Sequence, residues 1–249
     1  MKKYLLGAAA ALAIVAPGVA SAQSGYVDLG YTSTDFDGGD ADTTSLGGAY
    51  VWGGDGTVGF QIDGVIGQHD FSGGGDVDTY NIGGHAFVRN SGHLIGGFVN
   101  FGNTDFGGGA EYDYYTLGAE GAIYMQRTTL NGTLSWSDTE DLDASLTALD
   151  VGVTHFVTDN FSIGGTAGFG EIDPGTDSFT SFGLGGEYQF ATFPVSLYGG
   201  WTTTDYDGFE TDALTLGVRY NFGGTLFDRD RSGASLSRNG GFGRLGGIL

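Results

Sequence analysis

The feature that most constrains this chain is a repeated alternation of side chains. Segments of about ten residues alternate apolar residues with Gly, Thr, Ser or Asn, and clusters of Gly, Asp, Asn and Ser separate the segments. In segment 57–68, Phe60 and Ile62 lie on one face, and Gln61 and Asp63 lie on the other. Because successive side chains of a strand point to opposite faces, this period of two predicts β-strands.

The chain contains twelve such segments, and uncertain boundaries leave ten or fourteen as the range. An even number of strands in a closed sheet brings both ends of the chain to the same side. The segment 93–104 is ambiguous, because Leu94 and Phe98 lie on the face opposite to Ile95 and Phe101. The predicted strands are 25–34, 43–52, 57–68, 78–89, 93–104, 111–125, 128–138, 145–155, 161–171, 179–190, 195–204 and 212–222.

The two faces of these strands indicate a membrane protein rather than a soluble sandwich. The polar faces carry few charges, and lysine is absent after Lys3. Apolar rows such as 117–123 and 149–153 carry no charge on their own face. A barrel in lipid turns its apolar rows outward and its small polar rows inward. The pattern therefore predicts an all-β fold, a transmembrane antiparallel up-and-down β-barrel.

The connections between the predicted strands alternate in length. Short turns such as 53–56 and 126–127 alternate with longer acidic segments such as 35–42 and 205–211. Outer-membrane barrels have short periplasmic turns and longer extracellular loops. We therefore expect the acidic segments to face outside the cell.

The first acidic segment is a weak candidate for a metal site, and the last acidic segment carries a similar cluster of Asp205, Asp207, Glu210 and Asp212. Clustered carboxylate oxygens can bind Ca²⁺ or Mg²⁺, and such an ion could bridge to lipopolysaccharide phosphates. The spacing does not match the calcium-loop pattern, so a solvated acidic rim is the alternative. The candidate ligands are Asp35, Asp37, Asp40 and Asp42.

Residues 1–22 have the order of a secretory signal peptide. A positive start at Lys2 is followed by a short apolar run and then by small residues. The apolar run is too short to span about 30 Å of hydrocarbon. We expect cleavage after Ala22, with Ala20 as the second small residue of the site, and an exported mature chain.

Charge and cysteine content exclude several classes of function. The formal net charge is −21, with 9 basic and 30 acidic residues. Arg89, Arg127 and Arg219 are the only basic residues, counting Lys and Arg, between residues 23 and 222. Phosphate binding requires basic neutralisation, so no nucleic-acid partner is expected. The chain has no cysteine, which excludes disulfides and thiolate chemistry.

The last predicted strand ends in Thr215-Leu216-Gly217-Val218-Arg219-Tyr220-Asn221-Phe222. This stretch resembles the terminal β-signal of bacterial outer-membrane proteins, in which a polar residue, a glycine and two spaced aromatics end the final strand. Over residues 23–222 the chain resembles the porin-like barrel family. The resemblance implies an outer-membrane location among lipid and lipopolysaccharide. It also implies recognition by the barrel-assembly machinery through Thr215, Gly217, Tyr220 and Phe222.

Residues 223–249 depart from the family pattern, because the β-signal usually ends the polypeptide. This tail is rich in Gly, Ser and Arg and is net basic. Its composition predicts a disordered periplasmic extension. A second hypothesis is that the basic tail binds the acidic lumen as a plug or contacts an anionic cell-wall partner.

The residues on the inner faces of the strands favour a narrow channel. Small residues such as Gly83, Gly118 and Gly170 are expected to leave room for water. A ring of carboxylates favours cations. The expected function is passive passage of small neutral or cationic solutes. The expected lumen and selectivity residues are Asp63, His85, Arg89, Glu120, Asp150, Glu187 and Arg219.

Two alternatives to the channel remain open. In a closed structural or adhesive barrel, the inner charges would pair with one another and the acidic loops would be displayed. Catalysis would need a base held by an orienting partner, and His85 is expected to point inward alone. His69 and Asp70 sit together at the outer end of a strand, but we predict neither an enzyme nor an organic cofactor. The oligomeric state is not predicted.

Overall fold

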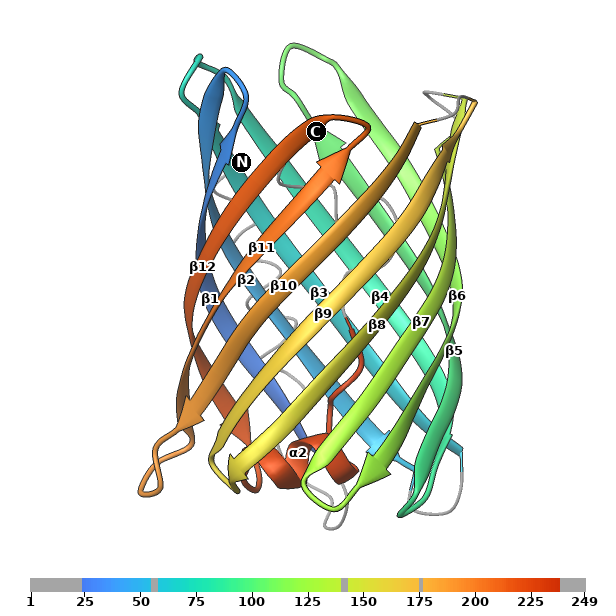
Figure 1. Cartoon of the computed structure of the whole chain (residues 1–249), viewed down its shortest axis with the longest axis vertical. Coiled ribbons are helices and arrows are strands. Elements are labelled where there is room, and N and C mark those ends of the chain that lie inside the picture. The colour runs from blue at the N-terminus through green and yellow to red at the C-terminus, as the bar shows by residue number, and fades with distance from the viewer. Residues whose placement is uncertain (1–23, 55–57, 140–142, 175–176, 238–249) are drawn as a thin grey trace.

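The computed structural model describes residues 24–54, 58–139, 143–174 and 177–237. The predicted signal peptide, with Ala20 and Ala22, and the end of the chain after residue 237 lie outside these residues. The described residues form one closed barrel of tilted strands and a short helix at one end of it (Figure 1).

The predicted fold class and strand number are confirmed. Every strand pairs antiparallel with its neighbours in the chain, in up-and-down order. The strands are β1 (Ser24–Phe36), β2 (Gly39–Gly53), β3 (Val58–Phe71), β4 (Asp76–Arg89), β5 (His93–Asp105), β6 (Glu111–Met125), β7 (Thr128–Thr139), β8 (Ala144–Thr158), β9 (Phe161–Asp173), β10 (Asp177–Gln189), β11 (Val195–Tyr206) and β12 (Phe209–Phe222). The helix is α2 (Leu226–Ser232).

The first and last strands close the barrel. Their register runs from Gly25 opposite Phe222 to Phe36 opposite Thr211. Closure removes the sheet edge, whose unpaired N–H and C=O groups would each cost several kcal/mol in lipid.

The outer surface carries the apolar rows, as predicted. Leu149 and Val151 of β8 are each 51 % exposed, and the other rows point outward in the same way. Aliphatic side chains occupy the middle of the wall, and aromatic side chains lie toward its two ends. The outward aromatic side chains toward the two strand ends include Trp52, Phe60, Phe161, Tyr188 and Tyr220 at one end, and Tyr31, Tyr80, Trp136, Phe182 and Trp201 at the other. An apolar band between two aromatic belts is the outer surface of a membrane barrel.

The prediction of longer acidic loops is wrong for the segments 35–42 and 205–211. Strands β1 and β2 continue through the acidic segment until only Asp37 and Gly38 connect them, and β11 and β12 are joined by Asp207 and Gly208. Asp207 and Gly208 have φ of 49° and 95°, the conformation of a two-residue hairpin that an Asp-Gly pair favours. The pairing of the strands therefore extends further than the loop composition indicated.

The two ends of the barrel still differ, but in strand length beyond the aromatic belts. Strand β11 continues from Trp201 to Tyr206, and the acidic hairpins extend beyond that belt. At the other end, β12 stops at Phe222, directly after Tyr220. The acidic end projects beyond its aromatic belt, and the opposite end is nearly level with the other aromatic belt.

Much of the inner space is filled by side chains. The ambiguity of β5 has a structural reason, since Leu94 is buried inside and the ring of Phe98 stacks on His85. The expectation that Gly118 and Gly170 leave room for water is wrong. A Cβ at Gly118 would overlap the ring of Phe98, and one at Gly170 would overlap the ring of Phe179. These glycines make room for aromatic rings from the neighbouring strand.

No helix in the described part of the chain is long and apolar enough to cross a membrane.

Candidate functional site: the lumen and the C-terminal tail

The C-terminal tail, defined here as residues 223–237, lies inside one end of the barrel (Figure 1). Thr225 caps α2, because its side-chain oxygen accepts a hydrogen bond from the Asp228 backbone N–H and its own backbone N–H donates to the Asp228 carboxylate. The prediction of a disordered tail is therefore wrong for these residues. The tail is ordered because its arginines meet buried carboxylates and carbonyl oxygens of the barrel wall.

Arg229 makes the most extensive of these contacts. Its Nη1 and Nη2 donate to the two carboxylate oxygens of Glu187 at 3.1 and 2.6 Å. Nη1 also donates to Oδ1 of Asn221. The guanidinium lies 5.4 Å from the ring centre of Tyr26. Strands β10, β12 and β1 thus all contribute to one guanidinium-binding position.

Arg219 lies next to this position and belongs to the wall itself. It donates to Asp28 Oδ2 from Nη2 at 2.8 Å and to Glu187 Oε2 from Nη1 at 2.7 Å. Its guanidinium stacks between the rings of Tyr26 and Tyr198, at 4.3 and 4.7 Å from their centres. A planar guanidinium suits both bidentate carboxylate pairing and aromatic stacking.

Further polar contacts hold the tail to the opposite wall. Arg89 donates to the carbonyl of Gly233 at 3.0 Å, and Thr129 donates to the Asp230 carboxylate at 2.6 Å. Burial raises the pKa of the Asp230 carboxyl, and the hydrogen bond from Thr129 acts against that shift. Gln61 of β3 pairs through its amide with the backbone of Leu236. The tail is therefore tied to several strands around the barrel.

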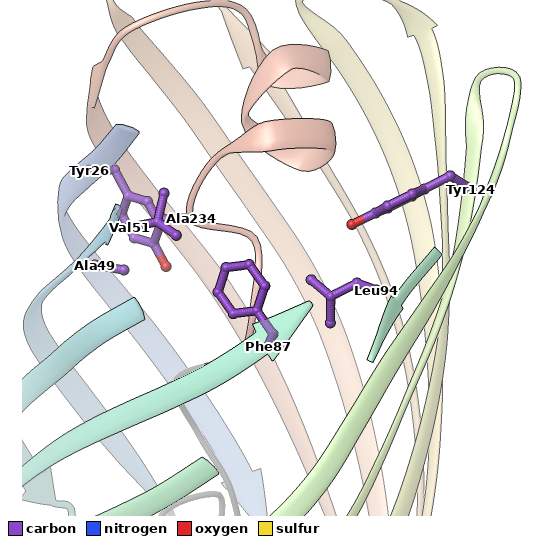
Figure 2. Close-up of a cluster of buried hydrophobic side chains, with 7 residues drawn as sticks. All are labelled: Tyr26, Ala49, Val51, Phe87, Leu94, Tyr124 and Ala234. Atoms are coloured by element: carbon purple, nitrogen blue, oxygen red, sulfur yellow. The ribbon is translucent and has the colours of Figure 1, made fainter. Parts of the chain in front are cut away.

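An apolar cluster supports the end of the tail. Side chains of β1, β2, β4, β5 and β6 form this cluster together with Ala234 of the tail, and Figure 2 shows Ala234 beside Tyr26 and Val51. Leu236 packs against the same cluster. The strand residues in this cluster are Tyr26, Ala49, Val51, Phe87, Leu94 and Tyr124.

A second charged cluster lies on the inner side of the wall, with one side chain each from β3, β4 and β6. His85 lies between two carboxylates, with Nε2 2.8 Å from Asp63 and Nδ1 2.9 Å from Glu120. The expectation that His85 points inward alone is wrong. Alternation placed His85 on the inner face, but the register that puts Asp63 and Glu120 at its two nitrogens is a property of the sheet.

The other half of the wall encloses a cavity at the tail end of the barrel, whereas Leu146 and Phe179 pack in a buried apolar cluster toward the acidic end. A cavity of about 420 Å³ lies against β7 to β12, where its wall presents glycine backbone and small hydroxyl side chains. Thr154, Thr166 and Thr202 line it, and Leu226, Arg229 and Ala234 of the tail bound it. Glu187 and Arg219 also face this cavity. Water and small polar solutes fit such a lining.

The predicted selectivity residues do not form one ring of carboxylates. Asp63, His85 and Glu120 form one cluster, Glu187 and Arg219 belong to a second, and Arg89 binds the tail. Asp150 lies on the inner face of β8, because its neighbours Leu149 and Val151 point outward. Whether any of these residues selects ions stays a prediction.

The sequence interpretation missed several members of these clusters. Asp28 alternates with Val27 and Leu29, so its inner position could have been predicted from the period of two. Tyr26 lies on the same face. The role of Arg229 had no comparable signal, because nothing in the tail sequence specifies that its helix lies inside the barrel.

The acidic end of the barrel holds the candidate metal ligands. Asp35 and Asp40 lie opposite each other on β1 and β2, near the tip of the first hairpin. In the described part of the chain, no three His, Asp or Glu side chains are grouped so that they could hold a metal ion. Binding of a divalent cation by Asp35, Asp37, Asp40 and Asp42 stays a prediction.

The residues of the predicted assembly signal alternate in direction. The ring of Tyr220 points outward and packs edge-on against Phe222, with ring centres 5.3 Å apart. Gly217 faces inward, where a Cβ would overlap the ring of Tyr198. The glycine of the signal thus makes room for a ring that stacks on Arg219. Recognition by the assembly machinery, including Thr215, stays a prediction.

The buried histidine of the outer rim is fully hydrogen-bonded. Nδ1 of His69 contacts Thr43 at 2.8 Å, and Nε2 contacts Thr79 at 3.1 Å. Asp70, its neighbour in the sequence, is exposed. The pairing of His69 with two hydroxyls gives no support to a catalytic His-Asp pair.

Comparison with solved structures identifies the fold. The translocator domain of the autotransporter NalP from Neisseria meningitidis is 14 % identical, with a TM-score of 0.58 over 89 % of this chain and 96 % of that chain. An outer membrane channel from Pseudomonas putida F1 is 15 % identical, with a TM-score of 0.57 over 84 % and 100 %. The KdgM porin is 10 % identical, with a TM-score of 0.55 over 79 % and 99 %.

The chain therefore has the fold of bacterial outer-membrane β-barrels, as its resemblance predicted. Porins, channels and an autotransporter translocator domain share this fold, so the fold by itself does not define the cargo. No protein-family model matches the chain, and no curated protein matches it.

Proposed function

We propose that this protein is a porin-like passive channel of the bacterial outer membrane, for small neutral or cationic solutes, and that its C-terminal tail closes one mouth. The observation that carries this proposal is the cavity along β7 to β12. Small polar residues line it, and the tail bounds it through hydrogen bonds, ion pairs and packing with the wall.

The size of the side chains supports a path along this half of the wall. Thr166, Gly183 and Thr202 present only small side chains to the cavity. Toward the acidic end of the same strands, the ring of Phe179 is buried. Twelve strands lie between small barrels filled by side chains and large aqueous porins. A narrow path beside a packed half is consistent with that intermediate size.

Charge supports a preference for cations. The projecting hairpins carry many carboxylates, among them Asp205, Asp207 and Glu210. A cleft of one charge sign raises the local concentration of oppositely charged solutes. The acidic rim would therefore concentrate cations at one entrance.

The outer surface supports the membrane assignment and an orientation. We place the apolar band in outer-membrane lipid, with the projecting acidic hairpins outside the cell, where a divalent cation could bridge them to lipopolysaccharide. The tail end then faces the periplasm. The acidic body gives no reason to expect a nucleic-acid partner.

Single-channel recording in planar lipid bilayers tests the proposal. The full chain and a variant that lacks residues 223–249 are compared at equal protein concentration. We expect the deletion to raise the conductance several-fold and to give discrete steps whose reversal potential shows cation selectivity. Silence in both proteins, each shown to be folded by its heat-dependent gel mobility, would contradict a channel.

One observation favours a second candidate, a closed structural barrel. The half of the lumen along β3 to β6 is packed by Phe87, Leu94 and Phe98 and by the pairing of His85 with two carboxylates. If the open half is also closed in the membrane, the protein would support the envelope or display its acidic hairpins. This candidate predicts silence in both bilayer experiments.

A further inference from the structure

We propose that Glu187, Asn221 and Tyr26 form a binding site for guanidinium-bearing solutes and that Arg229 of the tail is its internal occupant. The inference deepens the proposed function, on which it rests, by naming a solute class and its binding residues. A solute of this class would bind when the tail leaves the lumen.

The contacts of Arg229 define what the site recognises. Two parallel hydrogen bonds to the Glu187 carboxylate match the planar fork of a guanidinium, and an ammonium group cannot form both at once. Asn221 adds an amide oxygen as a third acceptor, and Tyr26 adds an aromatic face. Together these groups select charge, planarity and orientation.

The groups that bind Arg229 belong to the wall and are hydrogen-bonded to one another. Ser196 donates to Oε1 of Glu187 at 2.5 Å, and Asn221 donates to Ser196 at 3.1 Å. Glu187, Ser196 and Asn221 lie on the adjacent strands β10, β11 and β12. A binding group held by neighbouring strands loses little conformational freedom when a ligand arrives.

Charge balance requires an occupant. Without Arg229, the carboxylates of Asp28 and Glu187 face the single guanidinium of Arg219, so one negative charge is uncompensated. Glu187 is buried with Arg229 in place, and a paired cation offsets the cost of burying its carboxylate. A cationic solute would restore the balance that Arg229 provides here.

The cavity gives such a solute a place to lie. Glu187, Tyr26 and Arg219 all line the space of about 420 Å³ along β7 to β12. A guanidinium bound at Glu187 would therefore project the rest of its molecule into the proposed path.

The test uses the full chain with the substitution Arg229→Ala and methylguanidinium as the probe. The thermal midpoint of the folded barrel is measured in detergent by its heat-dependent gel mobility. We expect millimolar methylguanidinium to raise the midpoint of the variant, while methylurea, a neutral molecule of similar shape, does not. Adding Glu187→Gln should weaken this binding by about ten- to a hundredfold, as loss of a charged hydrogen-bond partner implies.

The matched control is Arg231→Ala, which removes the same charge from the same helix. Arg231 donates to the carbonyl of Gln126 and does not contact Glu187. Methylguanidinium should leave the midpoint of this variant unchanged. If Arg229→Ala does not fold, Arg229→Met replaces it, because methionine keeps much of the side-chain length and removes the cation from Glu187.

Equal stabilisation of the Arg229 and Arg231 variants, or none in either, would overturn the proposed site. The thermal measurement does not need ion flow, so it separates this inference from the channel itself. A silent barrel that binds methylguanidinium at Glu187 would contradict the proposed function and retain the site. Conductance without binding of methylguanidinium would support the channel and contradict the guanidinium site.

Discussion

At the scale of single residues, inner-face glycines act as partners of aromatic rings. Gly118 faces Phe98, Gly170 faces Phe179 and Gly217 faces Tyr198 across neighbouring strands. From the sequence, small inner-face residues such as these predict room for water. The structure shows that a glycine on the inner face can mean filled space, because the missing side chain is replaced by a neighbour's ring.

The substitution Gly118→Val tests this interpretation. Its side chain would overlap the ring of Phe98 and approach the carbonyl of Leu134, so we expect a loss of about 1–3 kcal/mol of folding stability. Denaturant-induced unfolding in lipid vesicles measures it. Gly84→Val is the control, since no atom lies within 4 Å of a Cβ at Gly84. Equal effects of the two substitutions would show that Gly118 leaves empty space.

At the scale of elements, the tail is the part of the chain on which the proposed function depends most. Its helix is only seven residues long, and isolated helices of that length are unstable in water. Contacts with the wall therefore hold it in place, through Arg229, Arg89 and the cluster around Ala234. Because none of these contacts is part of the strand pairing, we expect the barrel to stay folded when the tail leaves the lumen.

A disulfide between Ser24→Cys and Gly233→Cys tests whether the tail must move. Ser24 accepts a hydrogen bond from the Ala234 N–H, and a Cβ at Gly233 would point at the Ser24 side chain. The same Cβ would lie 2.9 Å from Cα of Arg229, so the tail backbone must shift slightly to accept the cysteine. We expect low conductance in the oxidised variant and a rise when reductant is added.

The natural chain has no cysteine, so this bond would be the only one that reductant can break. Each single-cysteine variant serves as a control that should not respond. Conductance that is high and unaffected by reductant would contradict closure by the tail.

At the scale of the whole molecule, the barrel is turned inside out relative to a soluble protein. Half-exposed aliphatic side chains cover the outside, and the buried charges pair within. Two aromatic belts bound the apolar band, and the acidic hairpins project beyond one of them. The direction of a side chain, outward or inward, therefore decides what a charge at that position costs.

Substituting arginine at Leu149 and at Thr166 tests the two directions. Leu149 points outward from the middle of β8, where an arginine in lipid should cost about 2–4 kcal/mol. Thr166 lines the open cavity, so Thr166→Arg should change stability much less and should lower cation conductance. The fraction folded in lipid vesicles and the bilayer current measure these effects. A larger stability loss at Thr166 than at Leu149 would contradict the orientation of the wall.

The sequence by itself determined the barrel. A period of two repeated over twelve segments specifies which side chains face lipid, because direction along a strand is a local property of the backbone. The same period placed Asp63, His85, Glu120 and Glu187 inside. The inward direction of these four side chains therefore followed from the local sequence pattern.

Only the tertiary structure decided what those residues touch. The pairing of His85 with Asp63 and Glu120, and of Arg229 with Glu187, depends on strand register and on the path of the tail. The strand register and the position of the tail bring together residues that are far apart in the sequence. A local sequence pattern does not specify such contacts. The extent of the hairpins was decided in the same way, since pairing with a neighbouring strand carried β1 and β2 through residues whose composition favours a loop.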